Sequence, residues 1–453
     1  MDTALENREK MNLGNRQTSD TPGPSRLSRF SKSGYMTPTL VGILCAILLI
    51  AAHERGHGNY HRLRDRVIPV TTEPNMETGP GGQSAVTLRR SPSAVSGEPE
   101  FLSATVLPGR GMNLLQIMAS VPGKGEVPIL LSPSLADATR ILTGAGEDAN
   151  GSVSTTFGAA ILAPWAGRLT GSPTSSSSTL ESVWEGERLS FPPGHPGGTI
   201  STMGLMLDRA ADNISTDTIP DGQAATAVYH AGSFSGSWPS MMEITVRTEL
   251  AERTLDLTVK EQNTGQVPTP AGVGWHPVFA LAGDRPDVRI VIPSITKVDI
   301  DHRTNLPSGK TVLTGGTTAD LIRARGTRLD EMSLNDTYTN LQSGLLGDGP
   351  IAEIRDPAAG YGLRLIPLTA NIKFLRVEAP AGERWISIEP DTNVDDPFGH
   401  EWPNPDDTGI VSLQPGESLQ WHVRLEIFSL ATPPLPPTAN NPTPAITNPG
   451  TPQ

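Results

Sequence analysis

The chain has 453 residues, a formal net charge of -13 and a single cysteine, Cys45. The acidic balance argues against a protein whose main task is to bind nucleic acid, because phosphate binding usually needs a basic surface. One cysteine excludes an intrachain disulfide framework and a cysteine-rich metal site. The 42 prolines and 46 glycines, with 5% aromatic residues, favour strands and turns over a helical bundle, so we expect an all-β protein.

The N-terminal segment has the composition of an export signal or a membrane anchor. Residues 1–34 form a polar, partly basic leader, and residues 35–55 contain the apolar run from Thr39 to Ala52. A spanning helix usually needs about 20 apolar residues, so both a cleaved signal peptide and a retained anchor fit this shorter run. We therefore expect an exported protein, membrane-anchored, periplasmic or extracellular. A buried helix of a soluble protein is the alternative interpretation.

Composition divides the rest of the chain. Residues 56–98 are charged and rich in Pro, Gly and Ser, which predicts a flexible linker. Residues 431–453 are mostly Pro, Thr, Asn and Ala, which predicts a disordered tail. Residues 99–430 lie between them and are expected to form one large domain.

Alternation of apolar and polar residues predicts several strands in that domain. It runs from Ile244 to Leu250 and again from Leu255 to Val259, with a turn between, which predicts a hairpin. The same pattern from Trp421 to Ile427 predicts a half-buried final strand. Around Ile388, alternation turns Glu389 away from the aliphatic side of its strand.

His276 and Glu389 are the candidate acid/base pair, each within strand-like sequence. Histidine and glutamate have solution pKa values of about 6.5 and 4.3, so one group can give a proton and the other take one near neutrality. The simpler interpretations are a histidine packed at a strand end and an exposed strand carboxylate. Asp391, Asp395 and Asp396 are expected to be solvated loop charges or ion ligands.

Several segments occur in the same order as in a known family. They are Ala104 to Gly111, Leu162 to Leu169, Asn263 to Gly265, Gly274 to Phe279, Leu306 to Gly309, Asn335 to Tyr338, Ile388 to Pro390 and Leu413 to Glu417. Over roughly residues 100 to 430, this set resembles the aldose 1-epimerase (galactose mutarotase) family. Gly-Trp-His-Pro, which contains His276, is its most specific segment.

The resemblance implies a large antiparallel β-sandwich, called a supersandwich, that binds a monosaccharide in an open cleft. It implies a reaction without metal or cofactor, with His276 as general acid at the ring oxygen and Glu389 as general base at the anomeric hydroxyl. It also implies that Arg168 and Asp336 hold sugar hydroxyls. Large aromatic residues are potential sugar-stacking platforms. We expect at most one of Trp165, Trp275 and Trp385 to serve so, and choose Trp275.

Purely structural roles remain the alternatives for these binding residues. Arg168 would form only a surface ion pair, Asp336 would cap a turn, and the tryptophans would lie in the core. A different function is also open. The chain could be a carbohydrate-binding protein without catalysis, or a sugar-phosphate epimerase, and a glycosidase would need a second suitably placed carboxylate.

Two positions depart from the family pattern. Met203 stands where many members have a second histidine, and a thioether cannot donate a hydrogen bond. His195, upstream in a Pro/Gly-rich loop, is a weak candidate to replace it. Gly167 stands where an asparagine is frequent, beside Arg168. Activity and substrate choice depend on how the fold accommodates these changes.

Overall fold

The computed structural model describes residues 75–92, 97–174, 179–195, 197–201, 203–315, 321, 326–330, 332–342 and 349–430. The predicted leader, apolar run and tail lie outside these residues, so those expectations stay predictions. Within the described part of the chain, no helix has both the length and the apolar character needed to cross a membrane.

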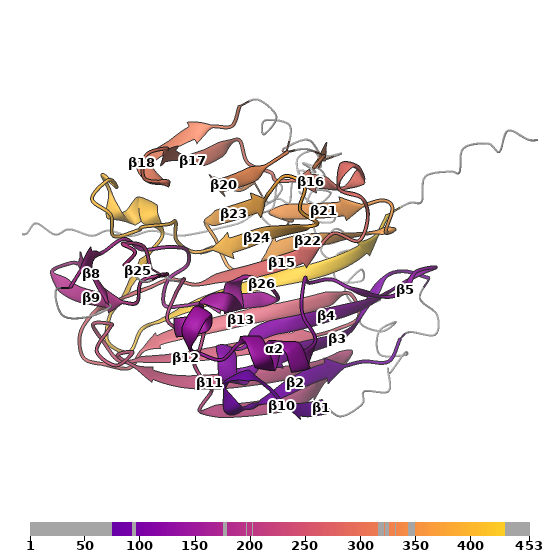
Figure 1. Cartoon of the computed structure of the whole chain (residues 1–453), viewed down its shortest axis with the longest axis horizontal. Helices are drawn as coiled ribbons and strands as arrows, with labels where there is room; N and C mark the ends of the chain where they lie inside the picture. The colour runs from indigo at the N-terminus through magenta and orange to yellow at the C-terminus, as the bar shows by residue number, and fades with distance from the viewer. Residues whose placement is uncertain are drawn as a thin grey trace, which may run out of the picture. The chain divides into compact units, whose positions relative to one another are not determined.

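A twelve-stranded sheet makes up one layer of the described structure (Figure 1). Its antiparallel strands follow the order β1 (Asn75–Thr78), β2 (Ser84–Arg89), β3 (Glu100–Leu107), β4 (Asn113–Val121), β6 (Ala159–Leu162), β15 (Gly274–Ala280), β24 (Trp385–Asp391), β23 (Phe374–Ala379), β20 (Leu334–Thr339), β17 (Thr296–Asp301) and β18 (Leu306–Leu313). The short strand β5 (Gly125–Pro128) pairs with β4. Residues distant in sequence therefore meet at the centre of the sheet, in β6, β15 and β24.

A nine-stranded antiparallel sheet forms the second layer of the described residues. Its order is β10 (Asn213–Ile219), β11 (Gly222–Gly232), β12 (Met242–Leu250), β13 (Thr254–Asn263), β26 (Ser418–Ser429), β22 (Tyr361–Pro367), β21 (Ala352–Asp356), β16 (Arg289–Val291) and β19 (Thr327–Arg328). The predicted hairpin is confirmed as β12 and β13. The predicted final strand is confirmed as β26.

Smaller elements surround the two sheets. The strands are β7 (Ser172–Pro173), β8 (Leu180–Trp184) and β9 (Glu187–Phe191) in one small sheet, and β14 (Thr269–Ala271) with β25 (Val411–Leu413) in another. The helices are α2 (Leu135–Ile141), η1 (Pro80–Gly82), η2 (Pro108–Arg110), η3 (Gly146–Thr155), η4 (Arg285–Asp287) and η6 (Pro405–Thr408). The expected all-β antiparallel sandwich is confirmed.

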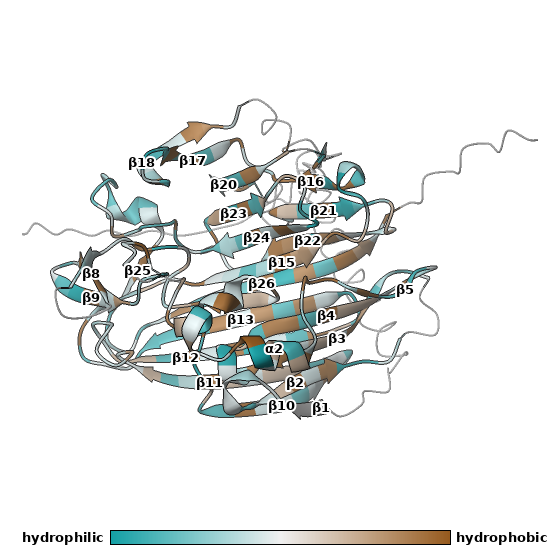
Figure 2. Ribbon diagram, in the orientation of Figure 1, coloured by the Kyte–Doolittle hydropathy of each residue, from teal (hydrophilic) through white to brown (hydrophobic). Residues whose placement is uncertain are grey.

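The core lies between the two large sheets. Along β13 and β26, buried and half-buried residues alternate, as in strands with one face on a core. Figure 2 shows the same change between hydrophobic and hydrophilic residues along the strands. Phe279 and Ile388 of the twelve-stranded sheet contact the same small space as Leu363 and Leu425 of the nine-stranded sheet. The face of β24 that carries Ile388 is therefore the core face.

The expected linker is wrong for residues 75–92. This part contains β1 and β2, which extend the twelve-stranded sheet next to β3. Val86 and Leu88 are fully buried, so the strands belong to the domain. The Pro/Gly-rich sequence between them forms the short helix η1 and a turn, and it masks two strands when composition is averaged over the segment.

Candidate active site

The candidate acid and base lie opposite each other on neighbouring strands. The register of β15 with β24 sets His276 opposite Glu389, two residues from the pair Gly274 and Asp391. Successive side chains of a strand point to opposite faces. Because Ile388 faces the core, Glu389 and His276 share the outer face of the twelve-stranded sheet.

The two side chains are in direct contact. His276 Nδ1 lies 3.0 Å from Glu389 Oε2, and the residues are 5% and 0% exposed. The contact is an ion pair when the imidazole is protonated. Within the described residues, each of these two atoms has the other as its polar contact.

Arg376 extends this row of charged groups. The register of β23 with β24 sets it beside Glu389, with its Nε 4.0 Å from Glu389 Oε1. The arginine is 8% exposed, and its Nη1 has no hydrogen-bond partner in the described structure. Thr337 of β20 continues the row on the next strand.

Some buried polar atoms of this row lack a hydrogen-bond partner among the described residues. Arg376 Nη1 and Asp391 Oδ1 are of this kind, and His276 Nδ1 and Glu389 Oε2 contact only each other. Buried polar groups are nearly always hydrogen-bonded, so such a group of neighbours indicates a site that binds a polar ligand. Among the described side chains, no cluster of three or more His, Cys, Asp or Glu is arranged to hold a metal ion.

Burial and the surrounding charges shift the pKa values of the two carboxyl groups of β24, Glu389 and Asp391, in opposite directions. Burial favours the neutral form of Glu389, but the charges of His276 and Arg376 outweigh it and hold the pKa of this carboxyl below its usual value. Burial, with the charge of Glu389, raises the pKa of Asp391 well above its usual value. The pKa values of the two carboxyls therefore shift in opposite directions, a pattern that suits separate roles for paired carboxyls.

Arg168 lies on the loop after β6 and is held by Asp395. Its backbone nitrogen donates to Asp395 Oδ1 at 2.9 Å, and its Nε and Nη2 donate to Oδ2 at 3.0 and 2.6 Å. Burial favours protonation of Asp395, but the charges of Arg376 and Arg168 hold its pKa below the usual value. The expected ion-pair alternative for Arg168 therefore describes its observed contacts, and contact with a sugar stays a prediction.

The segment after β24 fixes the loop that carries Arg168. Asn393 Nδ2 donates to the carbonyl of Ala166 at 2.9 Å, and its Oδ1 accepts from the nitrogen of Ala166 at 3.0 Å. Asp396 accepts from both the backbone nitrogen and the hydroxyl of Thr170, at 2.8 and 2.7 Å. The expectation that the aspartates after Glu389 are solvated loop charges is wrong, because Asp391, Asp395 and Asp396 are all buried.

The contact of Asp395 with Arg168 explains why position 167 is a glycine. Its φ is +69°, a left-handed conformation, and a Cβ there would lie 2.1 Å from Asp395 Oδ1. That oxygen is held by Arg168 and cannot move away without breaking the contact. An asparagine in this conformation would need a different arrangement of Asp395, so the departure at position 167 matches the local packing.

Replacing Gly167 by Ala should destabilise the domain by about 1–3 kcal/mol, through backbone strain and the clash with Asp395. Thermal unfolding measures the loss. Gly186→Ala is the matched control, because Gly186 also has positive φ, +88°, but nothing lies within 4 Å of its added Cβ. Equal losses for the two variants would contradict the role given to the clash.

Met203 lies beside the candidate site in an apolar cluster. It packs with Ala160, Leu162, Ala166 and Leu207. Ala160 pairs with His276 across β6 and β15, so the cluster borders the histidine. The position that would supply a second polar contact is thus apolar here. His195 is exposed on its loop, which gives no support for its entry into the site.

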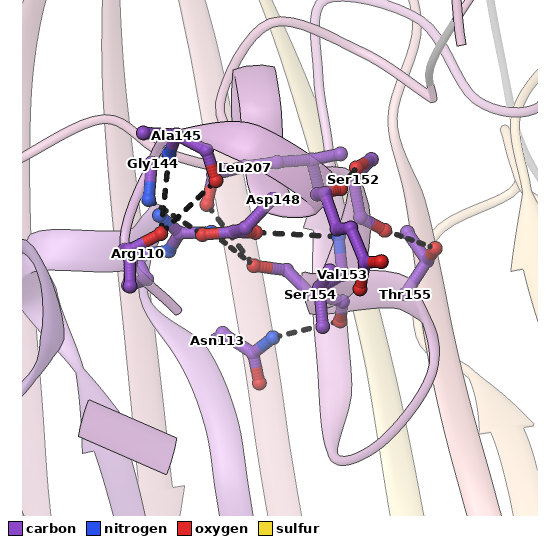
Figure 3. Close-up of polar contacts among 12 residues, drawn as sticks. Arg110, Asn113, Gly144, Ala145, Asp148, Ser152, Val153, Ser154, Thr155 and Leu207 are labelled. Atoms are coloured by element: carbon purple, nitrogen blue, oxygen red, sulfur yellow. Dashed lines mark hydrogen bonds and ion pairs between the residues drawn. The ribbon is translucent and has the colours of Figure 1, made fainter. Parts of the chain in front are cut away.

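A buried polar network supports the segment that carries Leu207 (Figure 3). Arg110 Nη2 donates to Asp148 Oδ1 at 2.8 Å and to Ser154 Oγ at 3.0 Å. The Ser154 hydroxyl in turn donates to the carbonyl of Leu207 at 3.3 Å. Arg110 and Asp148 side chains are each 2% exposed, so this ion pair is shielded from solvent. The network is structural and fixes the apolar border of the site.

Two expected substrate contacts are wrong. Trp275 precedes His276 in β15 and therefore points to the core face, where it is fully buried and meets Phe279 edge-on with ring centroids 6.2 Å apart. Asp336 is paired with Val377, which in turn is paired with the core residue Ile388. The aspartate thus lies on the opposite face from Glu389, and it accepts a hydrogen bond from Lys297 Nζ at 2.6 Å.

The structure adds Arg376, Asp391 and Thr337 to the residues on the site face. Asp391 follows Glu389 by two residues, so the period of a strand already places both on one face. Arg376 alternates with apolar residues of β23, but only the pairing with β24 shows that it meets Glu389. A sequence alone does not give that pairing.

Comparison with known proteins identifies the fold. The structure is similar to a galactose mutarotase-like protein from Clostridium acetobutylicum, with a TM-score of 0.63, 16% identity and coverage of 80% of this chain and 99% of that chain. It is similar to a galactose 1-epimerase from Lactobacillus acidophilus, with a TM-score of 0.55, 13% identity and coverage of 79% and 99%. A putative aldose 1-epimerase from Escherichia coli K12 gives a TM-score of 0.53 at 18% identity, with coverage of 72% and 96%.

At these identities the solved structures establish the fold alone. No curated protein matches the chain at a significant level. The sequence model of the aldose 1-epimerase family, however, matches residues 183–426, which include His276, Arg376 and Glu389. This match spans more than half of the chain, which therefore belongs to the aldose 1-epimerase family.

Proposed function

We propose that the protein interconverts the α and β anomers of a free hexose or related sugar. One observation carries the proposal: His276 Nδ1 and Glu389 Oε2 lie 3.0 Å apart, both buried on the outer face of the twelve-stranded sheet. A proton donor and a proton acceptor side by side suit a substrate whose two reacting oxygens share one carbon. The anomeric carbon of a pyranose bears the ring oxygen and the C1 hydroxyl in this way.

The reaction needs two coordinated proton transfers. Glu389 takes the proton of the C1 hydroxyl while His276 gives a proton to the ring oxygen. The bond between C1 and the ring oxygen breaks, and C1 becomes an aldehyde. Rotation about the bond from C1 to C2 presents the other aldehyde face, and the reverse transfers close the ring as the opposite anomer. Both groups return to their starting protonation states, and no electron is gained or lost.

The surroundings of Glu389 favour its role as base. The positive charges of His276 and Arg376 keep the carboxyl ionised at neutral pH despite its burial. We propose that the reaction requires no metal, because the two side chains account for both proton transfers. A sugar phosphate is a less suitable substrate, because Arg168 is matched by Asp395 and Arg376 by Glu389.

Polarimetry of freshly dissolved α-D-glucose and α-D-galactose tests this proposal with the full chain. We expect the approach to rotational equilibrium to accelerate in proportion to protein concentration, and dialysis against EDTA to leave the rate unchanged. Saturable sugar binding without acceleration would instead support a carbohydrate-binding protein, with the apolar environment of Met203 as its explanation. Loss of the rate after EDTA would contradict the metal-free mechanism.

We propose further that the protein acts outside the cytoplasm, as an exported or membrane-anchored enzyme. The basic leader and the apolar run from Thr39 to Ala52 support this localisation. Fractionation of cells that express the full chain, with N-terminal sequencing of the product, tests it. Uncleaved protein that remains in the cytosolic fraction would contradict it.

A further inference from the structure

Asp391 is a buried acid that the proposed proton transfers do not use. It is the last residue of β24, two residues after Glu389 and on the same face. Its neighbours across the sheet are Gly274 of β15 and Phe374 of β23. The strand period therefore places this carboxyl in the row next to the acid/base pair.

The side chain of Asp391 leans toward the strand that carries His276. A Cβ at Gly274 would lie 2.2 Å from Asp391 Oδ1, so the carboxyl occupies the space that a side chain at this position would fill. Gly274 is two residues before His276 on the same strand. The carboxyl group thus lies over β15, where it borders the histidine side of the site.

Asp391 differs from the other buried aspartates in its contacts. Both oxygens of Asp395 accept hydrogen bonds from Arg168, and both oxygens of Asp396 accept from Thr170. Asp391 is 3% exposed, and its Oδ1 has no partner among the described residues. Leaving a buried polar group unsatisfied costs about 1–3 kcal/mol, so a structural role alone does not explain its presence.

The charges around Asp391 favour its neutral form. Burial and the negative charges of Glu389 and Asp395 raise its pKa, and the positive charge of Arg376 only partly offsets them. A neutral carboxylic acid has an O–H group and can donate a hydrogen bond, which an ionised carboxylate cannot.

We propose that Asp391 is a substrate-binding residue of this site, whose carboxyl group forms a hydrogen bond with one hydroxyl group of the bound sugar. The inference rests on the proposed function and adds a specificity determinant to it. A buried site built to hydrogen-bond a hydroxyl discriminates strongly against an analogue that lacks it, because its own polar group is then left unpaired. The protein should therefore distinguish one hydroxyl position of its sugar from the others.

Deoxy sugars test the proposal in combination with Asp391→Ala and Asp391→Asn. The rate of anomer exchange is measured for the best aldose of the wild type and for its analogues that lack one hydroxyl each. For the wild type, kcat/KM should fall about 10- to 100-fold with one particular analogue. Asp391→Ala should lose a similar factor on the parent sugar and discriminate no further against that analogue.

The Asn variant separates hydrogen bonding from ionisation. Its amide donates a hydrogen bond but cannot ionise, so Asp391→Asn should keep most activity and the same selectivity. In the wild type, KM should rise at alkaline pH as the carboxyl loses its proton, and in Asp391→Asn this rise should be absent. Glu261→Gln is the matched control, because Glu261 is also fully buried with a raised pKa, but its position on β13 is within the core.

Four results would overturn the inference. A folded Asp391→Ala with unchanged rate and selectivity would remove the role, and an equal loss with every analogue would make it purely structural. A preference for an amino sugar at the selected position would show that the carboxyl binds as an anion. If the wild type binds sugars without exchanging their anomers, the proposed catalysis fails. The role of Asp391 is then tested by comparing the dissociation constants of the parent sugar and its deoxy analogues for the wild type and the variants. If it neither exchanges nor binds any aldose, both proposals fail.

Discussion

Replacing His276 by Ala or Glu389 by Gln should each slow anomer exchange by about 10²- to 10⁴-fold, the usual contribution of one acid or base group. Glutamine keeps the size of the glutamate side chain but cannot take the proton of the C1 hydroxyl. Alanine removes the donor to the ring oxygen. The two side chains act as one unit, so the double variant should be little slower than the slower single variant. Polarimetry with folded variants measures all three rates.

A second histidine–glutamate pair provides a matched control. His230 Nδ1 lies 3.1 Å from Glu243 Oε2, but these side chains are 58% and 34% exposed, on β11 and β12 of the other sheet. His230→Ala and Glu243→Gln should leave the rate of exchange unchanged. Full activity of Glu389→Gln would exclude Glu389 as the base, whatever the controls show.

Replacing Arg376 by Met should raise the pKa of Glu389, because it removes a positive charge beside that carboxyl. Arg376 is one of two cations that hold the pKa of Glu389 below its usual value. Without it, burial raises that pKa, because an opposite charge nearby favours the ionised carboxyl. The acid limb of the kcat profile should therefore move to higher pH. Removing one partner of a buried ion pair also costs about 3–5 kcal/mol of stability, so rates are measured well below the unfolding temperature.

Two further variants test this explanation. Arg376→Lys retains a positive charge and should restore most of the wild-type pH profile. Arg364→Met removes an arginine from β22 of the nine-stranded sheet, where its partners are Glu353 and Glu426, and should leave the profile unchanged. An acid limb that does not move in folded Arg376→Met would contradict the electrostatic role.

The strand pattern of the fold is largely local information. Alternation predicts β12, β13 and β26, because each places one face on the core between the sheets. It also places Glu389 on the face where it is observed. The strands at residues 75–92 escape prediction because they are short and enclose a Pro/Gly-rich turn, so the composition of the whole segment indicates a linker.

The wrong site assignments have two different causes. Trp275 and His276 are adjacent in one strand, so they cannot share a face, and this conflict is visible in the sequence itself. The sheet face of Asp336 can be assigned only from the pairing of distant strands. It follows from the pairing of Asp336 with Val377 on β23 and of Val377 with Ile388 on β24. Arg376 is missed for the same reason. Pairing between distant strands is the information that local patterns lack.

Exchange NMR of the full chain with aldoses at anomeric equilibrium tests the central claim most directly. The experiment reports transfer between the α and β signals of C1–H without a change in overall composition. We predict exchange cross-peaks with at least one free hexose or related aldose in the presence of the wild type, and their loss with Glu389→Gln. Folded wild type that produces no exchange with any aldose would contradict the account.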